Sequence, residues 1–160
     1  MFKLRKVDHR SDDALLASKL FSQNSFYPAL LNDLKRAKSQ VIIESPFITT
    51  RRVNSLLPTL RQLRKNGVEI VINTKPYEEH EPSLYVQAQI AIKKLQEIGV
   101  LVLFTAGHHR KLVIIDKQIT WEGSLNVLSQ NDSCEFMRRI YSEQLANQML
   151  VFLRLEKFIG

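Results

Sequence analysis

The apolar residues of this chain form short continuous runs that alternate with segments of helical spacing. The runs are nearly all apolar, which is typical of strands buried on both faces of a sheet. They cover residues 41–45, 68–73 and 100–104. Each of the two segments between the runs ends in a glycine suited to stop a helix, Gly67 or Gly99. Strands and helices in this order predict parallel pairing through right-handed crossovers.

The helices that this pattern predicts begin at residues suited to cap them. The apolar residues of 28–38 fall on one helical face, so a first helix is expected there. Asn54 or Ser55 is suited to cap the second helix, which places Pro58 in its first turn, where proline is tolerated. Ser83 is suited to cap the third helix.

The pattern changes after the third strand. We expect a β-hairpin over residues 111–123, a further strand over 136–141 and an amphipathic helix over 143–158. The chain then forms one α/β domain, residues 1–160, with a mixed, mostly parallel β-sheet flanked by helices on both faces. Residues 1–24 are expected to be an N-terminal extension of that domain.

The chain is basic, with 23 Lys and Arg against 16 Asp and Glu and a net charge of +7. Five cations and no acid lie between Ser45 and Val68, which favours an anionic partner such as a nucleic acid or a membrane surface. The candidate nucleic-acid contacts are Arg51, Arg52, Arg61 and Arg64. A solvated helix face is an equally good account of Arg61 and Arg64.

Other features of the composition exclude several classes of protein. Cys134 is the one cysteine, so no intrachain disulfide is possible and a reducing compartment is expected. No apolar run approaches the roughly 18 residues of a membrane span, and the polar N-terminal stretch is unlike a signal peptide. We therefore expect a soluble, cytoplasmic protein without stable membrane insertion. The sequence has no HExxH motif, cysteine pair or tight carboxylate cluster, so no metal or other cofactor is expected.

Two polar clusters flank the predicted hairpin. His109 and Lys111 precede its first strand, and alternation along a strand would place both side chains on one face, roughly 7 Å apart. Gly123, Ser124 and Asn126 follow its second strand. The hairpin would bring the two clusters to one end of the sheet. An imidazole, an ammonium group and neutral donors can form an anion site there that also holds a nucleophile or proton carrier.

The spacing of these residues resembles the HxKxxxxD…GSxN motif of the phospholipase D superfamily. The motif residues here are His109, Lys111, Asp116, Gly123, Ser124 and Asn126. The segment 41–48 (VIIESPFI), followed by a helix and a strand, is also similar to the entrance of such a domain. The resemblance covers residues 25–160 and implies a mixed sheet flanked by helices.

The resemblance also implies a role for the polar motif residues. His109 would be the nucleophile that forms a phosphohistidine intermediate. Lys111 and Asn126 would bind the phosphate oxygens, and Ser124 would assist from the loop. In the family a downstream carboxylate orients the nucleophilic imidazole, and the best match for it here is Glu135.

Three neighbouring residues receive a different interpretation. Asp132 is a weaker match than Glu135 for the orienting carboxylate. Asp116 belongs to the motif, but its place past the strand indicates that it organises the turn or pairs locally rather than contacts substrate. His108 would lie on the opposite strand face from His109, and we interpret it as structural.

Many enzymes of this family carry two copies of the motif in one chain, so that one histidine attacks phosphorus and the other protonates the leaving oxygen. This chain carries one copy, because none of the other histidines, His9, His80 and His108, begins a His-x-Lys sequence. We therefore expect a homodimer in which His109 of each subunit faces one phosphate across a twofold axis.

The resulting hypothesis is a metal-independent phosphodiesterase, and specifically a homodimeric nuclease of DNA or RNA. Small single-motif members of the family are mostly nucleases, and the positive charge suits a polynucleotide. Two alternatives stay open. One is a phospholipase D or phosphatidyltransferase that acts on phospholipids, which liposome association without nucleic-acid affinity would favour. The other is a nucleic-acid-binding module of a larger repair or restriction assembly.

Overall fold

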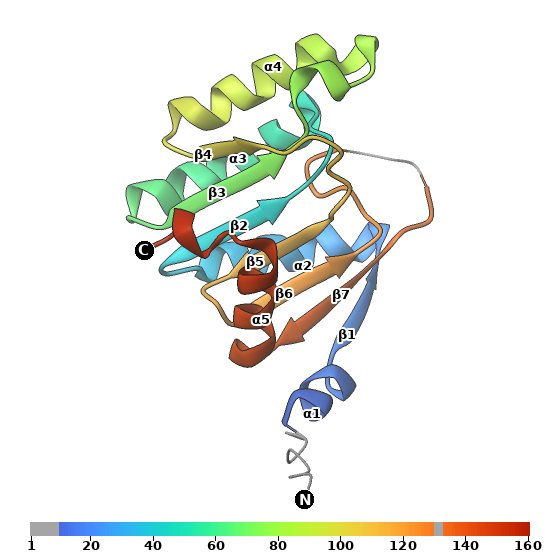
Figure 1. Ribbon diagram of the computed structural model, residues 1–160, viewed down its shortest axis with the longest axis vertical. Coiled ribbons are helices and arrows are strands. Elements are labelled where there is room, and N and C mark those ends of the chain that lie inside the picture. Colours follow the sequence, from blue (N-terminus) through green and yellow to red (C-terminus); the bar gives the residue numbers. More distant parts are fainter. Residues whose placement is uncertain (1–9, 130–132) are drawn as a thin grey trace, which may run out of the picture.

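A seven-stranded β-sheet forms the centre of the molecule (Figure 1). The computed structural model describes residues 10–129 and 133–160. The strands lie in the order β1-β7-β6-β5-β2-β3-β4. They are β1 (Lys19–Ser22), β2 (Gln40–Glu44), β3 (Glu69–Thr74), β4 (Leu101–Phe104), β5 (Leu112–Ile115), β6 (Ile119–Gly123) and β7 (Phe136–Tyr141).

Parallel pairing is confined to one half of this sheet. β2 pairs with β3 and β3 with β4 in parallel, whereas the other four neighbouring pairs are antiparallel. The mixed sheet is confirmed, but the expectation of mostly parallel pairing is wrong. The reason is that the hairpin of β5 and β6 does not extend the sheet beyond β4. Instead β5 pairs with β2 on the other side, and β6, β7 and β1 follow in antiparallel order.

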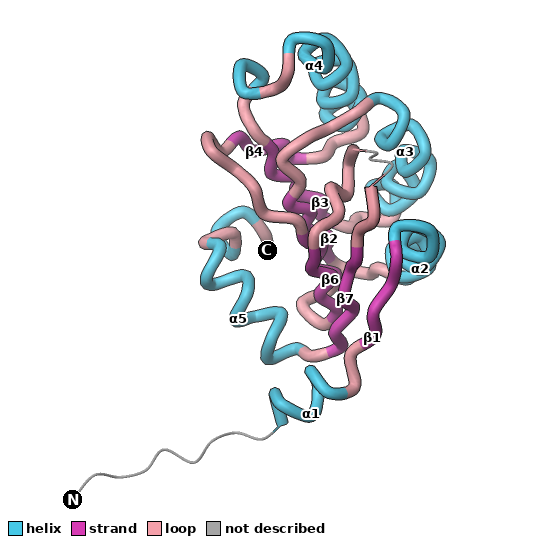
Figure 2. The backbone as a smooth tube through the Cα atoms, turned by 90° about the vertical axis from the view of Figure 1, so that its right-hand side faces the viewer, coloured by secondary structure: helices cyan, strands magenta, loops and turns pink. Residues whose placement is uncertain are grey.

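Helices cover both faces of the sheet, as expected (Figure 2). They are α1 (Arg10–Leu16), α2 (Gln23–Arg36), α3 (Thr50–Lys65), α4 (Pro82–Glu97) and α5 (Glu143–Leu153). α2, α3 and α4 pack on one face over a core that includes the fully buried Phe26 and Trp121. α5 lies on the other face, where Leu150 packs with Ile42 and Ile114. Within the described ranges, none of these helices is both long and apolar enough to cross a lipid bilayer.

Three helix starts differ from the sequence-based prediction. α2 begins at Gln23, before the expected 28–38. α3 is capped by Thr49, whose hydroxyl accepts a hydrogen bond from the backbone N–H of Arg52 at 3.4 Å. Pro58 therefore lies in the helix interior and not in the first turn. α4 begins at Pro82, because proline fits the first helical position, where no intrahelical N–H bond is needed.

Residues near both ends of the described chain contact the sheet. Residues 19–22, which we expected in an N-terminal extension, form β1 and pair with β7. The aromatic ring of Phe21 packs 4.9 Å from that of Trp121. At the other end α5 stops before Arg154, which adopts a left-handed φ of 56°, so the helix expected over 143–158 is shorter. The chain then stays on the same face as α5, and the backbone N–H of Gly160 donates to a carboxylate oxygen of Glu69 at 2.8 Å.

Asp116 connects the end of β5 to the start of β2. Its carboxylate accepts hydrogen bonds from the backbone N–H groups of Lys38, Ser39 and Gln40 at 2.9, 2.8 and 3.0 Å, and from the Ser39 hydroxyl at 2.9 Å. Burial alone would raise the pKa of Asp116, but these hydrogen bonds hold it below the ordinary value. Asp116 thus lies at the opposite end of β5 from Lys111 and organises the loop before β2.

We predict that Asp116→Asn lowers the free energy of unfolding at pH 7 by about 2 kcal/mol, the usual contribution of hydrogen bonds to a charged group. A lowered pKa stabilises the folded state above the ordinary pKa, and that stabilisation is lost as the pH falls through the folded-state pKa. The difference between variant and wild type should therefore shrink below pH ~4. Urea unfolding at several pH values measures it. Asp13→Asn, at an exposed position of α1, is the control; equal stability of both variants at pH 7 contradicts the prediction.

Candidate active site

The polar residues of the motif lie at one edge of the sheet. β2 and β3 are parallel, and β5 runs antiparallel to β2, so the carboxyl ends of β2 and β3 lie beside the amino end of β5. The hairpin returns the carboxyl end of β6 to the same edge, and the amino end of β7 lies next to it. Residues 105–111, which lead from β4 to β5, therefore lie at the same end of the sheet as these strand ends.

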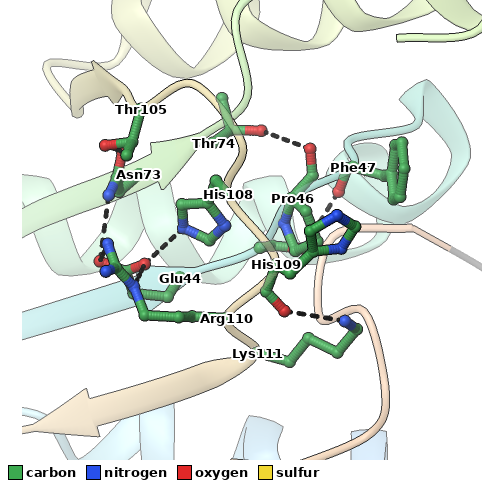
Figure 3. Close-up of polar contacts among 11 residues, drawn as sticks. Glu44, Pro46, Phe47, Asn73, Thr74, Thr105, His108, His109, Arg110 and Lys111 are labelled. Carbon is green, nitrogen blue, oxygen red and sulfur yellow. Dashed lines mark hydrogen bonds and ion pairs between the residues drawn. The ribbon is translucent and has the colours of Figure 1, made fainter. Parts of the chain in front are cut away.

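His109 and Lys111 lie in the segment just before β5, which begins at Leu112. The His109 side chain is exposed and that of Lys111 is half-buried. The ammonium group of Lys111 donates to the backbone carbonyl of His109 at 2.9 Å. Figure 3 shows both side chains pointing away from those of His108 and Arg110, so the expected alternation continues beyond the strand itself.

Gly123 and Ser124 continue the pairing of β6 with β7 beside this segment. At Gly123 a Cβ atom would overlap with the backbone carbonyl oxygen of Phe136, so only glycine fits there. The Ser124 hydroxyl accepts from the N–H of Phe136 at 3.1 Å, and the Ser124 N–H donates to the Phe136 carbonyl at 3.0 Å. Ser124 is therefore fixed in place next to the first residues of β7.

Glu135 lies in the same group. Hydrogen bonds from Ser124 and Ser133 hold the pKa of Glu135 below its ordinary value, and the positive charge of Lys111 acts in the same direction. The Ser133 hydroxyl donates to Glu135 at 2.8 Å. The structure thus brings Lys111, Ser124 and Glu135 together. Asp132, the weaker candidate for the orienting carboxylate, lies outside the described residues.

The loop that carries Asn126 is anchored by a tyrosine of α2. The Tyr27 hydroxyl donates to the carbonyls of Val127 at 3.0 Å and of Asn126 at 3.3 Å. Burial raises the pKa of Tyr27 to about 12, which the nearby Arg52 only partly opposes, so the hydroxyl stays a donor. The Oδ1 atom of Asn126 is buried and has no hydrogen-bond partner among the described residues.

The four candidate nucleic-acid contacts divide between the two ends of α3. Arg51 and Arg52 lie in its first turn, next to the Asn126 loop, and the Arg52 guanidinium stacks 3.3 Å from the centre of the Tyr27 ring. Arg61 and Arg64 lie toward its last turn, and Arg64 donates to the Val68 carbonyl at 2.6 Å. The structure thus separates Arg61 and Arg64 from the site.

A buried carboxylate beneath the His109 segment was not predicted from the sequence. Glu44, at the end of β2, is fully buried and contacts Nε2 of His108. It accepts from Arg110 Nε at 2.9 Å and from Asn73 Nδ2 at 3.1 Å (Figure 3). The signal was present in the sequence, because two apolar runs end in polar residues, Glu44 and Asn73, and parallel pairing places these residues side by side. His108 points away from His109, as expected for a structural residue.

This arrangement suits chemistry on a phosphate ester. The exposed imidazole of His109 can act as a nucleophile or carry a proton near neutral pH. Lys111 supplies a cation beside it, and Ser124 and Asn126 supply neutral polar groups. Glu135 supplies a carboxylate that can orient an imidazole. A phosphate placed between these groups would meet a nucleophile and donors to its oxygens.

Comparisons with known proteins identify the family and the fold of this chain. Residues 30–154 match the family model of the cardiolipin synthase, PLD-like domain. No curated protein matches the chain significantly. Among solved structures, Nuc from Salmonella typhimurium, a phospholipase D family member, has a TM-score of 0.72 at 16% identity, over 90% of this chain and 95% of that one. NucT from Helicobacter pylori has a TM-score of 0.68 at 17% identity, over 89% and 98% of the two chains. Phosphatidylserine synthase from Haemophilus influenzae Rd KW20 has a TM-score of 0.64 at 16% identity, over 88% of this chain and 37% of that one.

We predict that Tyr27→Phe loosens the Asn126 loop, because the loop carbonyls lose their donor. The free energy of unfolding should fall by about 1 kcal/mol, a typical net hydrogen-bond contribution. Amide hydrogen exchange should become faster in residues 126–129. Tyr141→Phe is the control, since Tyr141 is 63% exposed. Unchanged exchange in Tyr27→Phe would show that the loop is held by other contacts.

Proposed function

Because this chain belongs to the PLD-like domain family of the phospholipase D superfamily, we propose that it is a metal-independent phosphodiesterase, and specifically a nuclease of DNA or RNA. The observation that carries the proposal is the meeting of His109, Lys111, Ser124 and Glu135 at one edge of the sheet. These groups supply a nucleophile, a cation and an orienting carboxylate for attack on phosphorus.

In the proposed reaction an imidazole nitrogen of His109 forms a bond to phosphorus while the bond from phosphorus to the leaving oxygen breaks. A second, protonated histidine gives its proton to that oxygen. Water then attacks phosphorus, the second histidine takes the proton of the water, and the bond to His109 breaks. Lys111 and Asn126 stabilise the negative oxygens during both steps, and Ser124 and Glu135 hold the loop and the imidazole.

The second histidine requires a second copy of the chain, and the surface beside the site suits such a partner. A hollow of about 420 Å³ lies next to Lys111, between the sheet and α5. Phe136 and Phe152 line it, and their side chains are 53% and 76% exposed. Exposed aromatic side chains next to a half-complete site favour a self-complementary interface, which places His109 of each subunit near the twofold axis.

A polynucleotide fits the charge of the protein better than a small phosphate ester does. The net charge is +7, and Arg51 and Arg52 lie beside the Asn126 loop. Cations in the first turn of a helix are repelled by the positive end of the helix dipole. An anion bound there would offset this repulsion. Such binding should weaken steeply with salt, because it releases counterions from the phosphate backbone.

A phospholipid substrate is the second candidate. The exposed Phe136 and Phe152 beside the site favour it, because apolar side chains can contact acyl chains. The fold shared with a phosphatidylserine synthase fits it as well. Without cleavage of either substrate, tight binding to nucleic acid would indicate a binding module of a larger repair or restriction assembly.

The first test is cleavage of labelled single- and double-stranded DNA and RNA in excess EDTA, beside phosphatidylcholine and phosphatidylglycerol vesicles. We expect nucleic-acid cleavage that His109→Ala reduces by at least ~10³-fold, as removal of a nucleophile does. Lys111→Ala should lose about 10²-fold, because it removes a group that stabilises the developing charge. Lys93→Ala, an exposed lysine of α4, should cleave like wild type.

Three results would contradict the nuclease. Equal cleavage by wild type and His109→Ala would trace the activity to a contaminant. Cleavage of lipid alone would assign the phospholipid as substrate. Binding of nucleic acid with no cleavage of any substrate would assign a binding module.

We also predict that Phe152→Asp abolishes dimerisation, because it puts a charge into the proposed apolar interface. Sedimentation velocity should show a dimer for wild type and a monomer for the variant, and cleavage should be lost with the dimer. Val86→Asp, which changes an exposed apolar residue of α4, is the control and should remain a dimer. A monomeric wild type with full activity would refute the shared site.

A further inference from the structure

We propose that Glu44 is a positioning residue for His109: its buried carboxylate holds the two chain neighbours of His109 and thereby sets where the imidazole is presented. The inference rests on the proposed function for its catalytic consequence. Its structural content can be tested without any activity. Glu44 lies beneath the His109 segment and does not itself contact the proposed phosphate site.

The first step of the argument is the environment of the carboxylate. The Glu44 side chain has no exposed surface, and an isolated buried charge is strongly unfavourable. Burial alone would raise the pKa of Glu44, but hydrogen bonds from His108, Arg110 and Asn73 hold it below the ordinary value. The carboxylate is therefore kept charged by its partners, and it in turn fixes them.

The second step is where these partners lie in the sequence. His108 and Arg110 directly flank His109, and both side chains turn toward Glu44 (Figure 3). Arg110 donates from Nε at 2.9 Å and from Nη2 at 3.5 Å, which fixes the plane of its guanidinium group. With both neighbours directed to one side of the chain, the side chain of His109 must project to the other. Charge-assisted bonds on both sides of one residue leave its backbone little freedom.

The third step is the rigidity of the support beneath the carboxylate. Asn73 donates to Glu44 and accepts a hydrogen bond from the Thr105 hydroxyl at 3.0 Å. The N–H of Thr105 donates to the carbonyl of Thr74 at 2.9 Å. The N–H of Gly107 donates to the carboxylate of Glu79 at 2.9 Å. These hydrogen bonds hold the segment before β5 to the sheet and to the turn that contains Glu79. The exposed imidazole of His109 projects from this segment.

This support matters for the proposed reaction because nucleophilic attack needs the reacting atoms about 3–3.5 Å apart, and a displacement of about 1 Å can cost 10²-fold in rate. The imidazole of His109 is the proposed nucleophile, so its position affects the rate directly. If Glu44 lost its charge, Arg110 would be free to turn toward solvent, because 41% of its side chain is already exposed. The position of His109 would then vary, while the Asn126 loop, which Tyr27 holds, would keep its position.

The test compares Glu44→Gln with Asp33→Asn. Asp33 is the matched control because it is also a buried carboxylate with an arginine partner, Arg139, whose Nε donates to it at 2.7 Å. It belongs to α2, on the other face of the sheet. Each substitution keeps the side-chain volume and removes the charge, so both variants lose a buried ion pair. Only Glu44 is connected to the flanks of His109.

Two measurements are made on the intact protein at a temperature where both variants are folded. The first is the imidazole signal of His109 in a proton–carbon NMR spectrum, assigned by its absence in His109→Ala. We expect it to shift or broaden in Glu44→Gln and to stay unchanged in Asp33→Asn. The second is nucleic-acid cleavage, where kcat should fall ~10- to 100-fold in Glu44→Gln, with KM changed by less than ~3-fold.

An unchanged His109 signal in Glu44→Gln, or equal changes in both variants, would overturn the proposal. If Glu44→Gln does not fold, Arg110→Ala decides, because it removes one flanking donor that is partly exposed. The signal of His109 should then shift or broaden, and an unchanged signal refutes the role of the carboxylate. If wild type cleaves nothing, the proposed nuclease fails, and the NMR comparison still tests the positioning.

Discussion

The pairing of β5 with β2 is the constraint on which the rest of the structure depends. This antiparallel pair joins the β2–β3–β4 half of the sheet, which is parallel, to the β5–β6–β7–β1 half, which is antiparallel. It also brings the segment before β5 to the carboxyl end of β2. His109 therefore lies over Glu44, and the hairpin returns Ser124 to the same edge. Without this pair, the residues of the motif and Glu44 would lie in two separate sheets.

Carboxylates hold this strand pair at both of its ends. At one end Asp116 accepts four hydrogen bonds from the loop before β2. At the other end Glu44 binds the residues on either side of His109. The two carboxylates differ in the cost of their burial, since Asp116 is half-buried and Glu44 is fully buried. The larger cost is found at the proposed active site, where an accurate geometry is required.

The sequence was most informative where local patterns decide the structure. Apolar runs identified the buried strands, and the motif spacing identified the edge where Lys111, Ser124 and Glu135 meet. The direction of β5 could not be derived from periodicity, because the same apolar run pairs equally well with either neighbour. The start of α3 was misplaced because Asn54 and Ser55 are good caps, whereas tertiary contacts of the preceding loop select Thr49. Arg64 lies near the end of α3 whichever start is taken. Its separation from the site depends on the tertiary contact that places the start of α3 beside the Asn126 loop.

The last residues of the chain link the two halves of the sheet. α5 follows β7 in the antiparallel half, whereas Gly160 bonds to Glu69 at the start of β3 in the parallel half. The parallel half is built from strands and helices that are neighbours in sequence, and such local contacts form early in folding. Pairing of β1 with β7 joins residues more than a hundred positions apart, so it forms late. This order favours a nascent chain whose parallel half folds during synthesis, while the proposed catalytic edge is completed only after residues 136–160 have emerged from the ribosome.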